Sequence, residues 1–314
     1  MEWKSIMGSP DNAVFWLKLV CIAGFVYDFF LVTRDAKRQF ADPSCAPDLA
    51  RQKKFFAWNS FVGIVGNFLS TLGIGAFATS TALFKLRGSV DDINIPGTLN
   101  VGDAFPTLLQ AFLFLSFVEV DSLTLIVMIV SSVLGARLGA RVVTSWDRTK
   151  VRFGMGTGLA ILGVVMLCKQ LNIGPFGSTG TALELRGAKL FIAAAVNVFL
   201  GALMNIGVGN FGPCLVLYSS LGMNVAAAYP MMMGSSAVLL SFGNVPAFVK
   251  KSRYELYAVV AQAFWGCFSV GVAYWFVKSM SVTTLLYVVI CVVFLTSFLF
   301  FRDAIRDRRN ARLS

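Results

Sequence analysis

The chain of 314 residues contains no histidine, and charged residues make up only 14% of it. Without histidine there is no imidazole for a proton relay, for most zinc sites or for a Ser–His nucleophile. The six cysteines are scattered, with no Cys-x-x-Cys pair and no metal-ligand spacing, so we interpret them as buried structural residues. These absences argue against a metalloenzyme, a histidine-dependent hydrolase and a disulfide-stabilised domain.

Apolar residues are abundant instead. They make up 57% of the chain, phenylalanine alone occurs 29 times, and the mean hydropathy is +0.73. At least seven stretches are apolar over about 18 residues or more, the length that crosses roughly 30 Å of hydrocarbon. One soluble core has no room for all of them. The sequence therefore predicts an all-α polytopic membrane protein.

The basic residues indicate an orientation in the membrane. The net charge of +11 arises from residues that cluster beside apolar segments, which favours topology over nucleic-acid binding as its role. With 34–54 cytoplasmic, 21 of the 27 Lys and Arg residues lie in the inner segments 34–54, 85–97, 137–152, 250–255 and 302–314. We expect an outside N-terminus and a cytoplasmic C-terminus in the cytoplasmic membrane. The first apolar stretch lacks a cleavage site and reads as a retained helix.

Two of the apolar segments are too long for one simple span. The segments lie near 13–33, 55–84, 98–118, 122–140, 153–171, 187–221, 225–248, 256–277 and 282–301. As one helix, 55–84 would be about 45 Å long, and 187–221 would be longer. If both are re-entrant hairpins, seven spans remain and the basic loop 137–152 stays inside.

Both over-long segments contain the same short motif, which predicts an inverted repeat. Gly73-Ile-Gly-Ala-Phe77 recurs as Gly207-Val-Gly-Asn-Phe211, and Ala104-Phe105-Pro106 parallels Ala228-Tyr229-Pro230. Each unit would hold a broken hairpin and three spans, and an odd number of spans turns the second unit upside down. The expected domains are an N-terminal transmembrane helix (1–34), a cytoplasmic linker (35–54), repeat 1 (55–171), an external linker (172–186), repeat 2 (187–301) and a basic cytoplasmic tail (302–314).

The repeated glycines predict a substrate site near the bilayer midplane. Broken backbone at membrane depth is tolerated where it is buried in protein or lines a cavity, and transporters place substrates there. The second half-helix of each hairpin should begin at Ala76 and Asn210, with unpaired amides and a positive dipole end that attract an anion. The candidate substrate-binding residues are Asn67, Ser70, Thr71, Gly73, Gly75, Ala76, Asn205, Gly207, Gly209 and Asn210. The alternative is that the glycines only permit close helix packing.

Asp103 is the carboxylate of greatest interest, and two interpretations of it stay open. An ionisable group inside the membrane is a candidate for proton coupling. Alternatively, Asp103 caps a helix that starts late, with Pro106 in its first turn. Gln110 follows two turns later. Further polar residues in apolar segments are candidates for lining a pore: Gln262, Ser235, Ser236 and Asn244.

Other charged residues in apolar segments have a simpler interpretation. Lys18 and Asp28 lie toward opposite ends of the first helix, where their side chains can reach the interfaces. Arg137 and Arg141 flank the end of a Gly135-x-x-x-Gly139 packing motif and read as interfacial anchors.

These motifs, in this order, resemble the TauE/SafE family of sulfite exporters. The similarity rests on the Gly-x-Gly-x-Phe motif of each half and on the run Gly-Ala-Arg-Leu-Gly-Ala-Arg (135–141), and it covers most of 55–301. Ala76 and Asn210 stand where a third glycine is common. The resemblance implies outward transport of small sulfur-containing anions such as sulfite or organosulfonates. We expect no cofactor and no metal. A negative-inside potential drives anions outward by about 2.3 kcal/mol per charge per 100 mV.

Two other classes of protein compete with a transporter. An intramembrane enzyme needs a Ser–His pair, a metal–His motif or paired aspartates, and only Asp28 and Asp103 lie in apolar segments. A membrane assembly factor or sensor would use the repeat only as a scaffold. Transport of labelled sulfite separates these classes.

Overall fold

The protein is a bundle of helices in the part of the chain that the structure describes. This computed structural model describes residues 13–71, 76–115, 120–171, 173, 181–206, 214, 217–218, 221–276, 294–295 and 297–306. Five helices there are long and apolar enough to cross a membrane: Ala13–Ala41, Ser122–Val143, Gly187–Ile206, Pro230–Lys250 and Leu256–Trp275. Within these residues, β pairing is limited to a bridge between Ala182 and Met223. The prediction of an all-α membrane protein is confirmed at this level.

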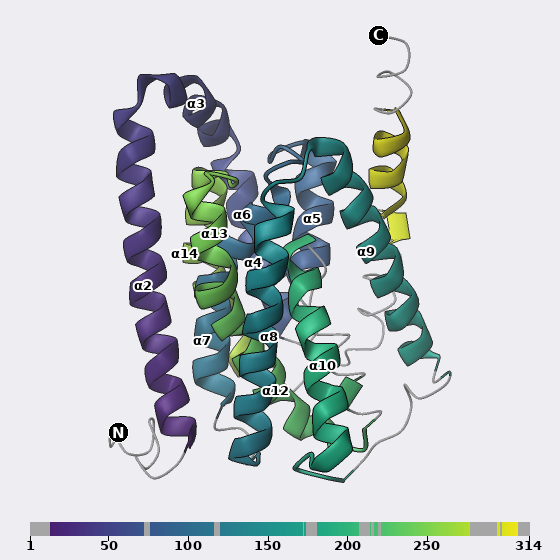
Figure 1. Ribbon diagram of the computed structural model, residues 1–314. Helices are drawn as coiled ribbons and strands as arrows, with labels where there is room; N and C mark the ends of the chain where they lie inside the picture. Colours follow the sequence, from purple (N-terminus) through teal and green to yellow (C-terminus); the bar gives the residue numbers. More distant parts are fainter. Residues whose placement is uncertain are drawn as a thin grey trace.

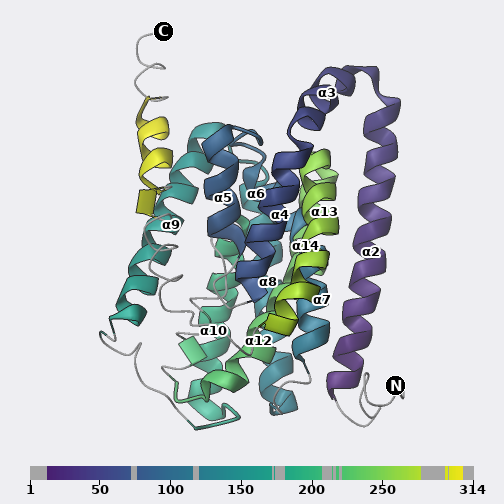
Figure 2. The same ribbon diagram turned by 180° about the vertical axis from the view of Figure 1, so that it is seen from behind.

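The first half of the chain runs between the two ends of the bundle, called upper and lower as in Figure 1. Its helices, in chain order, are α2 (Ala13–Ala41), η1 (Pro43–Cys45), α3 (Ala46–Lys54), α4 (Phe56–Thr71), α5 (Ala76–Arg87), α6 (Ile95–Gly102), α7 (Ala104–Phe114), α8 (Ser122–Val143) and α9 (Arg148–Gln170). Helix α2 stands at one edge and α9 leans away at the other (Figures 1 and 2). Helices α6 and α7 together descend from the upper to the lower end, with a break at Asp103.

The second half begins at the lower end. Its helices are α10 (Gly187–Leu203), η3 (Met204–Ile206), α12 (Val225–Val238), η4 (Leu239–Asn244), α13 (Val245–Lys250) and α14 (Leu256–Phe276). The stretch from α12 to α13 climbs to the upper end, and α14 descends beside α4 (Figures 1 and 2). The turn η4 is π-helical, so this climbing element is irregular in its middle.

Two segments enter the bundle and return to the end from which they started. The start of α4 lies beside the end of α5, because the Trp58 indole donates to Leu83 O at 3.2 Å and the Arg87 guanidinium lies 4.4 Å from the Trp58 ring centre. Near the start of α10, Lys189 donates to Leu221 O at 3.1 Å. The chain thus returns by Leu221 to the lower end, whereas α4 and α5 meet at the upper end (Figure 2).

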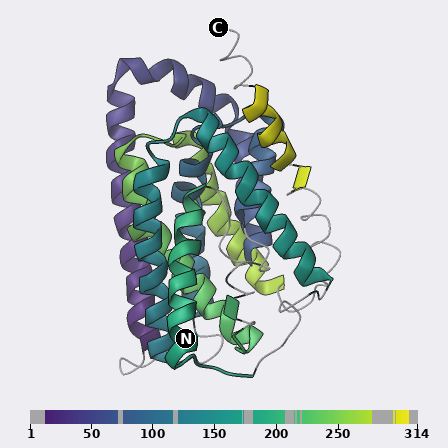
Figure 3. The same ribbon diagram turned by 45° about the vertical axis from the view of Figure 1, so that its right-hand side comes forward.

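Small residues allow two pairs of helices to pack closely. Helix α4 packs along α14, where a Cβ on Gly63 would lie 2.9 Å from Gln262 Cα. Helix α8 packs along α10 (Figure 3), with Gly135 against the backbone of Val198 and Gly139 against that of Ala202. The packing role predicted for the Gly135-x-x-x-Gly139 motif is confirmed.

Helix α2 differs from the expected helix at its end and in its buried face. It continues to Ala41, where Asp42 and Pro43 stop it, and so extends into the segment 35–54 that was expected to be a linker. Asp28 therefore lies well inside the helix, fully buried where α2 packs on η4, and Lys18 is only 3% exposed. For Asp28, the prediction that the side chain reaches an interface is wrong. The Lys18 ammonium lies 5.3 Å from the centre of the Phe112 ring, a cation–π contact.

Ion pairs close both ends of the bundle. At the lower end, Arg186 donates two hydrogen bonds of 2.8 Å to Asp121, which begins α8, and this guanidinium lowers the pKa of the carboxyl to about 2. At the upper end, Lys85 pairs with Asp92 at 2.6 Å and with Asp303 at 2.7 Å. The second pair fixes the last described helix, 297–306, against α5.

Candidate functional site

The last two turns of α4 contribute three of the predicted residues to one buried polar network. Asn67, Ser70 and Thr71 are at most 2% exposed. The Thr71 hydroxyl donates to Asn67 O at 2.8 Å and accepts from Gln110 Nε2 at 3.1 Å. Ser70 donates to Gln110 Oε1 at 3.4 Å. Helix α4 and helix α7, which carries Gln110, are therefore connected just before the first glycine motif.

Asp103 joins the same network at the break between α6 and α7. Its Oδ1 accepts from Asn67 Nδ2 at 3.1 Å and from Gln262 Nε2 at 3.2 Å. Its side chain makes no capping bond, its backbone angles are helical, and its amide donates to Leu99 O at 3.0 Å. Since the first-turn amides of α7 are not capped by this carboxylate, the cap interpretation is wrong. The carboxyl serves the network between α4, α6 and α14.

The residues just before the second glycine motif also contact α6 and α8. Asn205 Nδ2 donates to Ala136 O at 3.0 Å, which holds the end of α10 against α8. Asn100 Nδ2 donates to Met204 O at 3.3 Å, and Asn244 Nδ2 donates to Asn100 Oδ1 at 2.5 Å. Asn100 and Asp103 are three residues apart, so this short stretch at the end of α6 contacts the ends of both α4 and η3. Of the predicted residues before the two motifs, Asn67 therefore contacts the break between α6 and α7, and Asn205 follows a residue whose carbonyl bonds to α6.

The N-terminus of α5 is buried beside this network. Ala76, the first residue of α5 as predicted, is 5% exposed, and Phe77 and Ala78 are each 3% exposed. The first amides of a helix have no partner within it and carry its positive dipole end. In the next turn, the hydroxyls of Thr79, Ser80 and Thr81 are buried without a partner among the described residues. The predicted residues Gly73, Gly75, Gly207, Gly209 and Asn210 lie outside the described residues.

The bonding pattern shows which groups remain for a ligand. The side-chain amides of Asn67, Asn205 and Gln262 already donate to protein acceptors. In these network side chains, the atoms without a partner among the described residues are oxygens that can only accept or, on Asp103, carry a proton, among them Asn67 Oδ1, Asp103 Oδ2 and Gln262 Oε1. An anion would therefore depend on backbone amides and hydroxyls at α5.

Sequence reasoning missed one member of this network and left others unassigned. Asn100 gave no signal beyond a polar residue in an apolar stretch. Gln110, Gln262 and Asn244 were noted without partners, and each is fully buried at a helix contact. Ser235 and Ser236 are also fully buried, and nothing here assigns them to a pore.

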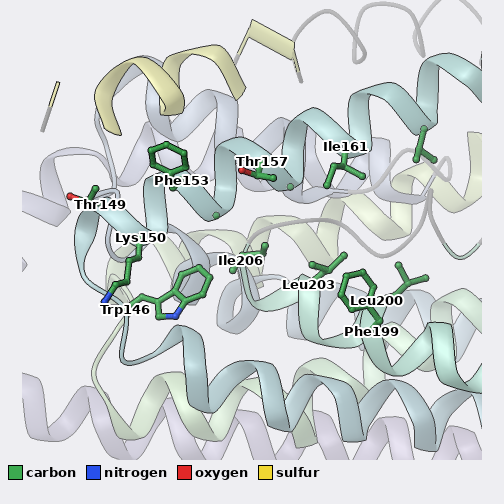
Figure 4. A pocket seen from close by; sticks show the side chains of 13 residues that line it. Trp146, Thr149, Lys150, Phe153, Thr157, Ile161, Phe199, Leu200, Leu203 and Ile206 are labelled. Carbon is green, nitrogen blue, oxygen red and sulfur yellow. The ribbon is translucent and has the colours of Figure 1, made fainter. Parts of the chain in front are cut away.

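A cavity of about 590 Å³ lies elsewhere, between α9 and α10. It is lined mostly by apolar side chains, with Trp146 and Lys150 at one end (Figure 4). Ile206, the last residue before the second glycine motif, also lines it. An apolar wall offers a small anion no hydrogen bonds, so we do not place the anion there. Among the described residues, no group of acidic, cysteine or histidine side chains could hold a metal ion.

No family model, curated protein or solved structure matches this chain.

Proposed function

We propose that this protein is a membrane transporter that exports small sulfur-containing anions across the cytoplasmic membrane. The observation that carries the proposal is the buried N-terminus of α5, which begins at Ala76, together with a polar network that extends to Thr71 and Met204, shortly before the two glycine motifs. A helix N-terminus enclosed at mid-bundle is an anion site of the kind that transporters use. The class of anion rests on the resemblance to sulfite exporters.

The arrangement of the helices supports an inverted repeat. Helices α4 and α5 enter from the upper end, and α10 enters from the lower end (Figures 1 and 2). Helix α14 packs on α4, and α8 packs on α10, so the second span after each hairpin packs on the first helix of the other half's hairpin. The two irregular elements, α6–α7 and α12–η4–α13, meet through Asn100 and Asn244. Such a repeat would place the substrate between the two hairpins.

A proton on Asp103 would make the network compatible with an anion at the N-terminus of α5. Asp103 is 1% exposed and one hydrogen bond from Asn67, whose carbonyl accepts from Thr71 at the end of α4. An ionised carboxylate there would repel an anion at α5, whereas a protonated one would not. A divalent anion that leaves with one proton still carries net negative charge outward, so the membrane potential still favours export.

An assembly factor or sensor remains the main alternative function, and an intramembrane enzyme is a weaker alternative.

A transport assay with purified protein separates a transporter from these two classes. Proteoliposomes that contain the protein should accumulate labelled sulfite, or a labelled two-carbon sulfonate, faster than empty liposomes. Sulfate and thiosulfate define the selectivity. Gly75→Ala and Gly209→Ala should weaken anion binding by roughly 1–3 kcal/mol, the cost of a lost charge-assisted hydrogen bond. Proteoliposomes that accumulate none of these anions would overturn the proposal.

The charge distribution supports a cytoplasmic upper end. Lys53 and Ser145 are exposed at that end, whereas Glu184 is exposed near Asp121 at the lower end. In a cysteine-free variant, cysteines that replace Lys53 or Ser145 should resist a membrane-impermeant thiol reagent in intact cells, and a cysteine at Glu184 should react. The reverse labelling pattern would show that the orientation is wrong.

A further inference from the structure

Asp28 is a buried carboxylate that the proposed anion site does not use. It lies on α2, outside the expected repeat, and is fully buried. Neither carboxyl oxygen has a hydrogen-bond partner, and no Lys or Arg lies within ion-pair distance of it in the described ranges. An unpaired charge in hydrocarbon is costly, so a carboxyl in this position is neutral or binds a cation.

The carboxyl faces the π-helical turn η4. The Ser241 hydroxyl lies beside it, without the geometry of a hydrogen bond, and has no other partner among the described residues. One turn earlier on α2, a Cβ on Gly24 would lie 3.4 Å from the same Ser241 Oγ, and the Tyr27 ring stacks on Phe242. Helix α2 is therefore held closely against η4 in the turn that precedes Asp28.

The turn η4 also connects to the candidate anion site. A π-helical turn breaks the regular backbone ladder and is frequent at functional positions. The carbonyl of Phe242 accepts from Nε of the exposed Arg137 at 3.1 Å. Asn244, three residues after Ser241, donates to Asn100 in the site network. A change at Asp28 thus acts on the turn that positions Asn244.

We propose that the contact between α2 and η4 is a proton-binding site, in which protonated Asp28 donates a hydrogen bond to Ser241. A proton from water forms the O–H bond, and the neutral acid needs no counter-ion. Loss of this proton leaves a buried charge that favours separation of α2 from η4. The site differs from Asp103, which belongs to the network of α4, α6 and α14.

Few other titratable groups face Asp28. Helix α7 (Ala104–Phe114) and η4 contain none, α13 contributes only the exposed Lys250, and the side chain of Tyr229 on α12 is not among those described. On α2 itself, Asp35 accepts from Gln39 at 2.8 Å and from Tyr254 at 2.7 Å. Lys18, Cys21 and Arg34 lie further along the helix.

Infrared spectroscopy of the protein in lipid nanodiscs tests this site without any transport assay. The pH-difference spectrum should contain the carbonyl band of a protonated carboxylic acid that Asp28→Asn removes. Asp35→Asn and Asp103→Asn should leave that band in place, and Ser241→Ala should shift it because the acid loses its acceptor. The shift in Ser241→Ala keeps the test valid if Asp28→Asn does not fold.

Two results would overturn the proposal. One is a pH-difference spectrum from which Asp28→Asn removes no carboxylic acid band, with no shift in Ser241→Ala. The other is a carboxylate band at Asp28 that responds to sodium instead of pH, which would make the site a cation site. Neither result depends on whether the protein transports anions, so a failure here is distinct from a failure of the proposed function.

Discussion

Gly135→Val is expected to abolish the accumulation of folded protein. The Cβ of any larger residue would overlap the carbonyl of Val198 and would lie 2.6 Å from its carbon and 2.9 Å from its Cα. Those atoms belong to the backbone of α10, so no flexible side chain can move aside. Overpacking usually costs 1–3 kcal/mol, and we expect at least about 3 kcal/mol here because two helices must separate.

The matched control is Gly271→Val on α14. A Cβ at Gly271 meets no atom within 4 Å, so this variant should behave as wild type. Size-exclusion chromatography of a fluorescent fusion in detergent, followed by thermal unfolding, measures both variants. A Gly135→Val protein that elutes and unfolds like the wild type would show that α8 and α10 do not pack as described.

This helix pair matters for the site as well as for stability. Asn197 Nδ2 donates to Met128 O at 2.6 Å, and Asn205 Nδ2 donates to Ala136 O at 3.0 Å. Both bonds fix α10 along α8, and the second one lies just before the glycine motif of the second half. Separation of the two helices would therefore move Met204 away from Asn100 and divide the network.

The sequence was a good guide where local chemistry decides the structure. Apolar length predicted the helices, the glycines predicted that α5 begins at Ala76, and Gly135 and Gly139 predicted a close helix contact. In each case the cause lies within a few residues. A membrane also leaves backbone amides no alternative to helices, which makes such predictions dependable.

Features that depend on distant partners were not predictable from the sequence. Asp28 looked like an interfacial residue because nothing in α2 shows that η4 packs over it. The prediction that Asp103 caps α7 failed because its carboxyl accepts a hydrogen bond from Gln262 instead. This partner is 159 residues away, so the local sequence does not reveal it. The π-helical turn η4 has no proline or glycine pair that would reveal it, although Gly243 lies within it. Long-range packing decides each of these.

Asp103→Leu is expected to abolish transport, and Asp103→Asn is expected to preserve transport but remove its dependence on pH. Leucine leaves the amides of Asn67 and Gln262 without their shared acceptor in a buried network. Asparagine retains an oxygen for both amides and cannot ionise. In the wild type, the affinity for a sulfonate should fall about tenfold or more as pH rises and the carboxyl ionises, because like charges repel strongly in the interior.

A sulfonate is the suitable probe because its own charge is constant over the range tested. Asp121→Asn is the matched control: the Asp121 carboxyl, whose pKa Arg186 lowers to about 2, stays ionised between about pH 5 and 8. Its loss should leave the pH profile unchanged. Binding of the labelled sulfonate to purified protein, measured across this range for wild type and both Asn variants, decides the matter. If Asp103→Asn retains the wild-type slope, the proton that governs anion binding is carried by another group.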